Sequence, residues 1–309
     1  MSAASRQQPA ASLDGVLVID KPAGPTSHDV VARMRRVLGT PRIGHTGTLD
    51  PFATGVLPLV IGRATRLSAF LSGGEKEYEA GIRFGLGTET YDGSRLSGAA
   101  IVAPAGLDRS AIEQALTAFR GTFDQMPPPY SAKKIEGVAA YKLARKNKPV
   151  PLRAVPVTVS VLVLDTYEGG LAHVRVRATA GFYVRSLAHD LGQRLGCGAH
   201  LESLRRTRAG AFTLEAGLPL ELAESDPDSA KASVLPLERL LPEIPAVTLN
   251  DRGVWRATHG NEVGPDDLVT QGSVVGDERR RRLLDGAGRL LGIAETRPGD
   301  LLHPVLVLV

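Results

Sequence analysis

A single carboxylate stands in an uncharged, glycine-rich stretch of the sequence. The segment GHTGTLDPFATGVLPL, residues 44 to 59, contains one acid, Asp50, followed directly by Pro51. Pro51 disfavours helical backbone at Asp50, and the glycines at 44, 47 and 55 allow tight turns and close approach of another molecule. An acid so placed could project from a rigid rim onto a bound ligand. The alternative is an aspartate that caps its own turn.

Other constellations that could carry chemistry are weak. The sequence has no phosphate-binding loop ending in GK[ST], and GAGRLLG has the wrong glycine spacing for a dinucleotide site. Cys197 and His200 form one possible metal-ligand pair, but no second pair completes a tetrahedral site. Ser27, His28 and Asp29 are consecutive, and neighbouring side chains on a helix do not face one another, so we interpret them as capping residues. No cofactor is implied.

Basic residues are clustered. The chain has a net charge of +4, yet residues 130 to 153 alone hold seven Lys and Arg residues against one acid. Two further clusters are Arg194 with Arg205, Arg206 and Arg208, and the run from Arg279 to Arg282. Clusters of this kind indicate a polyanionic partner, and solvated surface is the alternative.

Composition indicates a soluble, cytoplasmic protein. Hydrophobic residues make up 43% of the 309 residues and charged residues 23%, which is typical of globular domains. The single cysteine excludes an intrachain disulfide and fits a reducing compartment. Residues 1–13 lack the apolar core of a signal peptide, so we expect a short disordered leader. No apolar run is long enough for a membrane span.

The elements that would position Asp50 follow from hydrophobic periodicity. Residues 15–24 predict a buried strand, and 56–62, 76–85, 155–165 and 171–181 predict further strands. Helices are predicted over 26–39, 109–121 and 184–196. In the first of these, Ser27 is the expected cap, Asp29 lies in the first turn and Gly39 closes the helix. The irregular alternation favours an α+β fold, a mixed sheet with helices packed on it.

The chain divides near residue 222. Residues 14–222 are the expected first domain, and the polar stretch ESDPDSAKAS opens a loop or linker over 223–244. From 245 to 309 we find short strands such as GSVVG, GRLLGIAE and PVLVLV and no convincing helix, which predicts a small β-barrel-like domain.

Several motifs in order resemble the TruB family of tRNA pseudouridine(55) synthases. GHTGTLDPFATGVLPLVIGRATR is similar to the family's catalytic motif, and GVLVIDKPAGPTSHD is similar to its N-terminal motif. Three further segments resemble family motifs: KEYEAGIRFGLGTETYDGS at residues 76 to 94, PPPYSAKKIEGVAAYKLAR and GFYVRSLAHDLGQRLGCGAHLESLRRT. The matches span roughly residues 15 to 215 of the sequence.

The resemblance implies a largely antiparallel mixed sheet flanked by helices, then a PUA-type domain. It also implies a reaction: a T-loop uridine of tRNA becomes pseudouridine, with the target nucleotide flipped into a pocket. Asp50 would be the catalytic carboxylate, attacking C1′ or taking the 2′ proton. Arg185 would pair with Asp50 and hold its pKa down.

The same resemblance assigns the remaining candidates. His45 would fill the space left by extruded bases, Tyr78 and Tyr183 would stack on the uracil or line its pocket, and Leu204 would line it too. Lys21 would support the motif loop or a phosphate. Lys134, with Lys133 beside it, would contact phosphate from an RNA-gripping insertion at about 124–152.

The sequence departs from the family pattern at two places, and two alternative functions remain open. Phe182 stands where the family commonly has threonine, and the C-terminal part resembles a PUA domain only in size, position and strand content. A guide-RNA-dependent relative with protein partners is one rival, which the basic insertion disfavours; an RNA-binding chaperone is the other. We expect a monomer that binds the tRNA T-stem-loop without an obligatory protein partner, a membrane or a cofactor.

Overall fold

The computed structural model describes residues 13–96, 101–130, 134–135, 138–139, 152–269 and 279–308. The leader expected over 1–13 therefore lies outside the described residues except for Leu13, and so does the GSVVG strand. Most of the basic insertion, with Lys133, is outside them as well. Lys134 lies in a short strand, β6 (Lys134–Ile135), paired with β7 (Val138–Ala139), and its side chain is not described.

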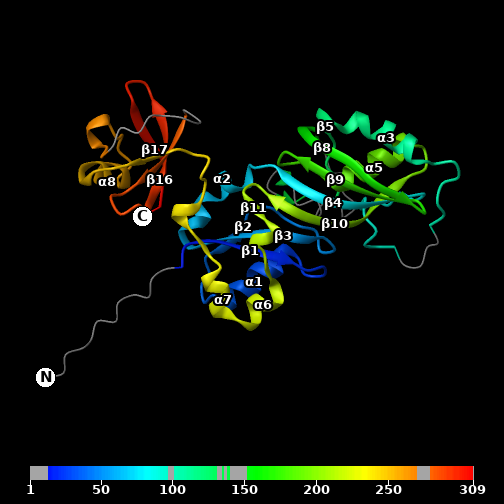
Figure 1. The fold of residues 1–309 in the computed structure, drawn as a ribbon, viewed down its shortest axis with the longest axis horizontal. Coiled ribbons are helices and arrows are strands. Elements are labelled where there is room, and N and C mark those ends of the chain that lie inside the picture. The colour runs from blue at the N-terminus through cyan, green and yellow to red at the C-terminus, as the bar shows by residue number, and fades with distance from the viewer. Residues whose placement is uncertain are drawn as a thin grey trace.

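A mixed, mostly antiparallel sheet forms the larger part of the molecule (Figure 1), as the sequence predicts. Its central path runs β12-β1-β3-β10-β4-β9-β8-β5. The β1–β12 and β3–β10 pairs are parallel and the other pairs are antiparallel. Its strands are β1 (Gly15–Lys21), β2 (Ile43–His45), β3 (Thr54–Ile61), β4 (Lys76–Phe84), β5 (Gly121–Gln125), β8 (Val155–Glu168), β9 (Leu171–Ala178), β10 (Ala199–Ala209), β11 (Phe212–Thr213), β12 (Leu218–Pro219) and β13 (Leu235–Pro236).

The three helices predicted for this region are present. They are α1 (Ser27–Val37), α3 (Arg109–Leu116) and α5 (Val184–Arg194), joined by the short α2 (Ser68–Ser72) and by η1 (Gly62–Leu67), η2 (Thr117–Phe119) and η3 (Leu214–Ala216). Capping of α1 differs from the prediction: Thr26 is the N-cap and forms a capping box with Asp29. Ser27 instead exchanges hydrogen bonds with the backbone of Leu49. In Figure 1, α3 and α5 lie at the β5–β8 end of the sheet and α1 lies near β1.

The prediction of a loop after residue 222 is wrong, because two short helices occupy this segment. These are α6 (Leu220–Ser225) and α7 (Pro227–Ala232), with Asp226 capping α7 at Ser229. Ala223 and Ala230 are fully buried in the main core. Both helices are six residues long and carry few apolar residues, so their periodicity is too weak to detect in the sequence.

The C-terminal part contains an open four-stranded sheet, among the residues described, in the order β14-β15-β16-β17. Its elements are β14 (Ala246–Thr248), β15 (Arg280–Leu284), β16 (Leu290–Arg297) and β17 (Leu301–Val307), with η4 (Leu237–Arg239) before them and η5 (Pro265–Asp267) within. The expectation of no helix is wrong, since α8 (Asp251–Thr258) is present and Asn250 caps it. Gly253 interrupts its apolar pattern, yet a Cβ there would lie 2.4 Å from the Asp267 carbonyl oxygen.

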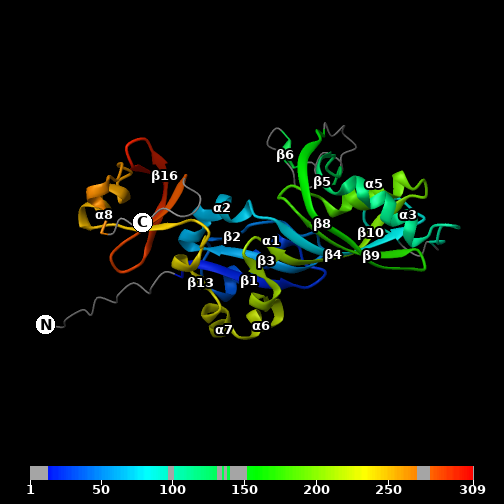
Figure 2. The same cartoon turned by 45° about the horizontal axis from the view of Figure 1, so that its top comes forward.

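Shared hydrophobic packing joins the two parts. Ile293 and Leu308 belong to the same buried cluster as Val16, Val60 and Leu67. Figures 1 and 2 place the C-terminal sheet at one end of the long axis and the β5–β8 edge at the other. None of the helices described is both long and apolar enough to cross a membrane.

Candidate active site

The loop that carries Asp50 connects β2 to β3 and is anchored by a buried lysine. The Lys21 ammonium, fully buried, donates to the carbonyl oxygens of Pro51 at 3.1 Å and Ala53 at 2.7 Å. Ser27 adds a hydrogen bond to the Leu49 amide at 2.8 Å. Burial lowers the pKa of Lys21 to about 8, although the Asp50 carboxylate opposes this. The sequence leaves two roles open for Lys21, which are to anchor the loop or to bind a phosphate. These contacts favour the role of loop anchor.

Arg206 anchors the other side of this loop. Its Nε donates to the Val56 carbonyl at 2.7 Å and its Nη2 to the Gly47 carbonyl at 3.0 Å. The side chain is 1% exposed, so burial lowers the pKa of Arg206, and the Tyr78 phenol beside it counteracts that shift. The sequence had placed Arg206 in a surface cluster for a polyanion, and burial makes this part of the prediction wrong.

Asp50 and Arg185 form a two-point ion pair. Arg185 Nε lies 2.9 Å from Asp50 Oδ2, and its Nη2 donates to Asp50 Oδ1 at 3.1 Å. The guanidinium comes from the first turn of α5 and also donates to the carbonyl oxygens of Thr90 and Tyr130. Its side chain is 6% exposed, whereas that of Asp50 is 31% exposed. Arg185 is therefore fixed from several sides, and it holds the more accessible carboxylate of Asp50 in place.

The pKa of Asp50 moves opposite to the expected direction. Burial raises the pKa of this carboxyl, and the Asp92 carboxylate adds to the increase. Arg185 and Lys21 lower it, as expected of neighbouring cations, but burial is the larger influence. The carboxylate is thus more basic than an exposed aspartate, which favours proton abstraction or attack on carbon once it is ionised.

Asp92 is a site residue that the sequence reading missed. Its carboxylate lies 3.6 Å from Arg185 Nη1 and accepts hydrogen bonds from Thr90 Oγ1 and from the amide and hydroxyl of Ser94. The backbone between Thr90 and Asp92 is strained, since Tyr91 has φ 63°. The Tyr91 ring stacks on His189 of α5 at 3.8 Å between ring centroids. A polar turn, TETYDGS, is the only signal of this arrangement in the sequence.

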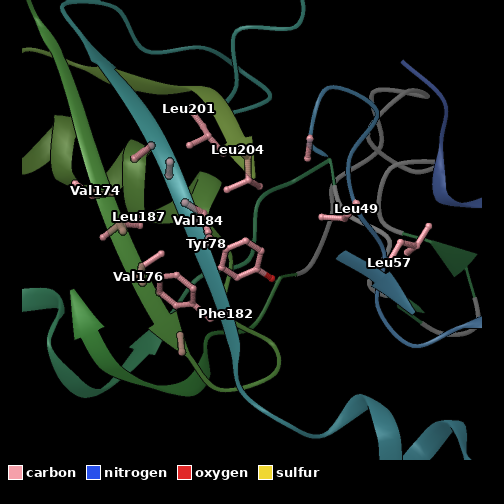
Figure 3. Packing of buried hydrophobic residues seen from close by; sticks show 14 of the residues in the cluster. Leu49, Leu57, Tyr78, Val174, Val176, Phe182, Val184, Leu187, Leu201 and Leu204 are labelled. Atoms are coloured by element: carbon pink, nitrogen blue, oxygen red, sulfur yellow. The ribbon is translucent and has the colours of Figure 1, made fainter. Parts of the chain in front are cut away.

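A cavity of about 350 Å³ opens beside Asp50. Tyr78 from β4, Leu204 from β10 and Phe182 form much of its apolar wall and are each less than 10% exposed. Figure 3 shows these three side chains grouped with Val184, while Leu49 lies across from them on the loop. The full lining is Gly47, Thr48, Leu49, Asp50, Lys76, Tyr78, Gly181, Phe182, Tyr183, Val184, Arg185, Leu204 and Arg206.

The Phe182-Tyr183 pair is held by the neighbouring strand. Gln125 of β5 accepts from the Tyr183 amide at 2.8 Å and donates to the Tyr183 carbonyl at 3.0 Å. Phe182 is buried in the main core and also lines the cavity. The aromatic residue at 182 therefore fills the wall beside Tyr78 and leaves Tyr183 and Arg185 in the lining.

His45 is not in the lining of this cavity. It pairs with Leu59 in the β2–β3 ladder, and its ring stands edge-on to His28 at 6.3 Å between centroids. Its buried Nδ1 has no hydrogen-bond partner among the described residues. Burial and the nearby charges of His28 and Arg206 lower the pKa of His45.

The His200 ring lies 2.7 Å from the Leu86 carbonyl, and the described residues contain no cluster of His, Cys, Asp and Glu that could hold a metal ion.

Comparison with known proteins gives matches over nearly the whole chain. Residues 35–184 match the model of the TruB family pseudouridylate synthase N-terminal domain, and 185–242 match that of the tRNA pseudouridylate synthase B C-terminal domain. A tRNA pseudouridine synthase B from Solibacter usitatus is 44% identical over 300 residues, covering 96% of this chain and all of the relative. One from Thermobifida fusca is 42% identical over 306 residues, covering 95% of this chain and 98% of the relative.

Solved structures agree with this fold. A chain of a Cbf5-Nop10-Gar1 complex superimposes with a TM-score of 0.73 and 26% identity, covering 98% of this chain and 88% of the other. A chain of an H/ACA RNP bound to a substrate RNA containing 2′-deoxyuridine gives 0.72 and 25%, with the same coverage.

Proposed function

The chain belongs to the TruB family of pseudouridine synthases, and on that premise we propose that it isomerises the T-loop uridine at position 55 of tRNA, with Asp50 as the catalytic carboxylate. The observation that carries the proposal is the Asp50–Arg185 pair at the edge of a cavity lined by Tyr78. The carboxylate is accessible from the cavity, and its partner is buried.

One carboxylate is enough for an isomerisation. The N1–C1′ bond breaks, the base turns, and C5 bonds to C1′; nothing is hydrolysed, oxidised or passed to a second substrate. Ionised Asp50 either attacks C1′ or takes the 2′ proton. Both routes need its negative charge and a fixed orientation, which the two contacts from Arg185 supply.

The cavity suits a single extruded nucleoside. At about 350 Å³ it lies at the small end of the range of ligand pockets. Tyr78 and Leu204 offer apolar surface on which a uracil ring can pack, and Tyr183 and Phe182 extend that surface. Uridine stacked within the T-loop cannot reach Asp50, so the nucleotide must be flipped.

The relatives favour tRNA as substrate over a guide-dependent target. The relatives named tRNA pseudouridine synthase B share 38 to 44% identity with this chain over nearly its full length, whereas the chain of the Cbf5-Nop10-Gar1 complex shares 26%. We therefore propose a monomer that acts on tRNA in the cytoplasm without an obligatory protein partner.

Product formation and RNA binding, measured on the same samples, test the proposal. An unmodified T-stem-loop RNA is given to the wild type and to Asp50→Asn or Asp50→Ala, with no cofactor added. We expect product only from the wild type and RNA affinity within a few-fold for the variants. Affinity lost in parallel with activity would assign Asp50 a structural role, and a wild type that binds without forming product would favour a chaperone or a guide-dependent enzyme.

A further inference from the structure

Besides Arg185, two more cations line the cavity: Arg206, which is buried, and Lys76, which is half-buried. Lys76 lies on β4 and Arg206 on β10, and both belong to the cavity wall. The charges that act on the Asp50 carboxyl are those of Arg185, Asp92 and Lys21, so neither Lys76 nor Arg206 serves as its partner. In the part of the chain that the structure describes, neither cation has a carboxylate partner.

The sheet places these cations next to the surface proposed for the base. Arg206 is the direct cross-strand partner of Tyr78. Lys76 precedes Tyr78 by two residues and Leu204 precedes Arg206 by two, so each cation shares a sheet face with one of these two residues. A Cβ built on Gly47 would lie 3.3 Å from Arg206 Nη1 and 3.7 Å from Lys76 Cε. The two side chains therefore converge on the same part of the wall, beneath the Asp50 loop.

Both cations keep donors free. Lys76 Nζ donates to the carbonyl oxygens of Ser72 and Gly74, each at 2.8 Å, which leaves one of its three N–H groups. Arg206 uses Nε and one Nη2 hydrogen on the loop, and the Tyr78 phenol also bonds to the guanidinium, which leaves part of its five N–H groups. Burial lowers the pKa of Lys76 to about 8, and the positive charge of Arg206 acts in the same direction. Two like charges that converge in a partly desolvated wall are costly unless an anion joins them.

We propose that Lys76 and Arg206 stabilise the detached uracil as an anion during the isomerisation proposed above, on which this inference rests. When N1–C1′ breaks, its electron pair leaves with the base. C5 then bonds to C1′ as the bond from C1′ to Asp50 breaks or the 2′ proton returns. C5 gives up its proton while N1 takes one up, so charge on the base is transient. Preorganised cations act most strongly on charge that appears only during the reaction.

A phosphodiester group fits this position less well. It is linked to nucleotides on both sides, so it must stay near the mouth of the cavity, whereas Arg206 is 1% exposed. A phosphate contact would also be made before the reaction begins and would appear in affinity rather than in rate.

Lys76 is the residue to change, because Arg206 also anchors the loop. Lys76→Met removes the charge at similar size, and Lys76→Arg keeps a charge. The matched control is Lys231→Met, at an exposed lysine on α7 whose side chain is ion-paired to Asp228. Single-turnover rate, RNA dissociation constant and melting temperature are measured for each.

We expect Lys76→Met to lower the single-turnover rate by about a hundredfold, with affinity within a few-fold of wild type. Lys231→Met should behave as wild type. In the wild type the rate should fall as pH rises through about 8, where Lys76 loses its charge, and the fall should be smaller in Lys76→Arg, in which only Lys21 still loses its charge near that pH. The pH dependence of the rate in Lys76→Arg tests the inference even if Lys76→Met folds poorly.

An unchanged rate in folded Lys76→Met overturns the inference, and so does a loss confined to affinity, which would assign Lys76 to a phosphate. An alkaline limb that persists unchanged in Lys76→Arg also contradicts it. Failure of the proposed function is distinguishable from all of these, because the wild type itself would then yield no pseudouridine.

Discussion

At the scale of single residues, the ionisation of Asp50 is set by opposing neighbours. Burial and Asp92 raise its pKa, whereas Arg185 and Lys21 lower it. Asp92 therefore has two effects, since it also lies 3.6 Å from Arg185 and helps to fix that guanidinium. Activity that needs the ionised carboxylate should fall as pH decreases through this raised pKa.

Replacing Asp92 should separate these two effects. In Asp92→Asn one cause of the raised Asp50 pKa is gone, so the acid limb of the pH–rate profile should move to lower pH. The plateau rate should drop about tenfold or more, because Arg185 loses one of its supports. A single-turnover pH series measures both. A limb that moves to higher pH would contradict the assignment.

The sequence could identify residues whose chemistry is tied to a motif. Asp50, Tyr78, Tyr183, Arg185 and Leu204 are all brought to one cavity. Asp92, Lys76 and Arg206 stand in the same family-like segments, but the resemblance assigned them no role, so the sequence did not single them out as site residues. Asp92 and Arg206 are distinguished by burial and Lys76 by its place in the cavity wall, and both features follow from strand register and from contacts between residues distant in the chain.

At the scale of elements, the Asp50 loop depends on the end of β1. Lys21 is fully buried and donates to three backbone carbonyl oxygens, two of them in the loop. Removing a buried donor leaves its acceptors unsatisfied.

Lys21→Met should lower the free energy of unfolding by about 2–4 kcal/mol and reduce the isomerisation rate. Urea denaturation and the single-turnover assay measure the two effects, with Lys231→Met as control. Unchanged stability together with weaker RNA binding would favour the phosphate role that the sequence left open.

Element prediction succeeded where periodicity was long. The helices α1 and α5 have eleven residues each and show clear apolar faces, and α3 has eight. The helices α6 and α7 were missed because they have only six residues each, and α8 was missed because Gly253 interrupts its apolar pattern. Tertiary packing stabilises them: Ala223, Ala230 and Ala257 are each buried.

At the scale of the whole molecule, the boundary between the two expected domains stays a prediction. Leu290, Ile293 and Leu308 share a buried cluster with residues of β1, β3 and η1. Deleting the C-terminal part would expose this cluster, so point substitutions test its proposed PUA-type RNA-binding role better than truncation does.

Two lysines whose pKa is lowered in the folded state make global stability depend on pH. The pKa values of Lys21 and Lys76 are both lowered from 10.5 to about 8 in the folded state. Above pH 8 the unfolded chain therefore binds more protons at these lysines, and their contribution to the free energy of unfolding should rise with pH. Urea denaturation between pH 7.5 and 9.5 measures this, and the rise should be smaller in Lys76→Met. A rise of the same size in Lys76→Met would contradict the shift assigned to that lysine.

RNA affinity should depend strongly on salt. The basic insertion at about 124–152 is predicted to contact phosphates, and each contact contributes about one to the slope of log affinity against log salt. Lys134→Ala should reduce that slope by about one without changing sequence preference. A flat response in the wild type would count against the insertion as an RNA-gripping segment.

The most direct measurement is release of tritium from C5 of uridine in a tRNA labelled at that carbon. Pseudouridine formation must expel this hydrogen, so the readout follows the bond rearrangement itself. We expect release by the wild type without cofactor, none by Asp50→Asn, and none from a tRNA with cytidine at position 55. Release by Asp50→Asn at the wild-type rate would contradict the central role of that carboxylate.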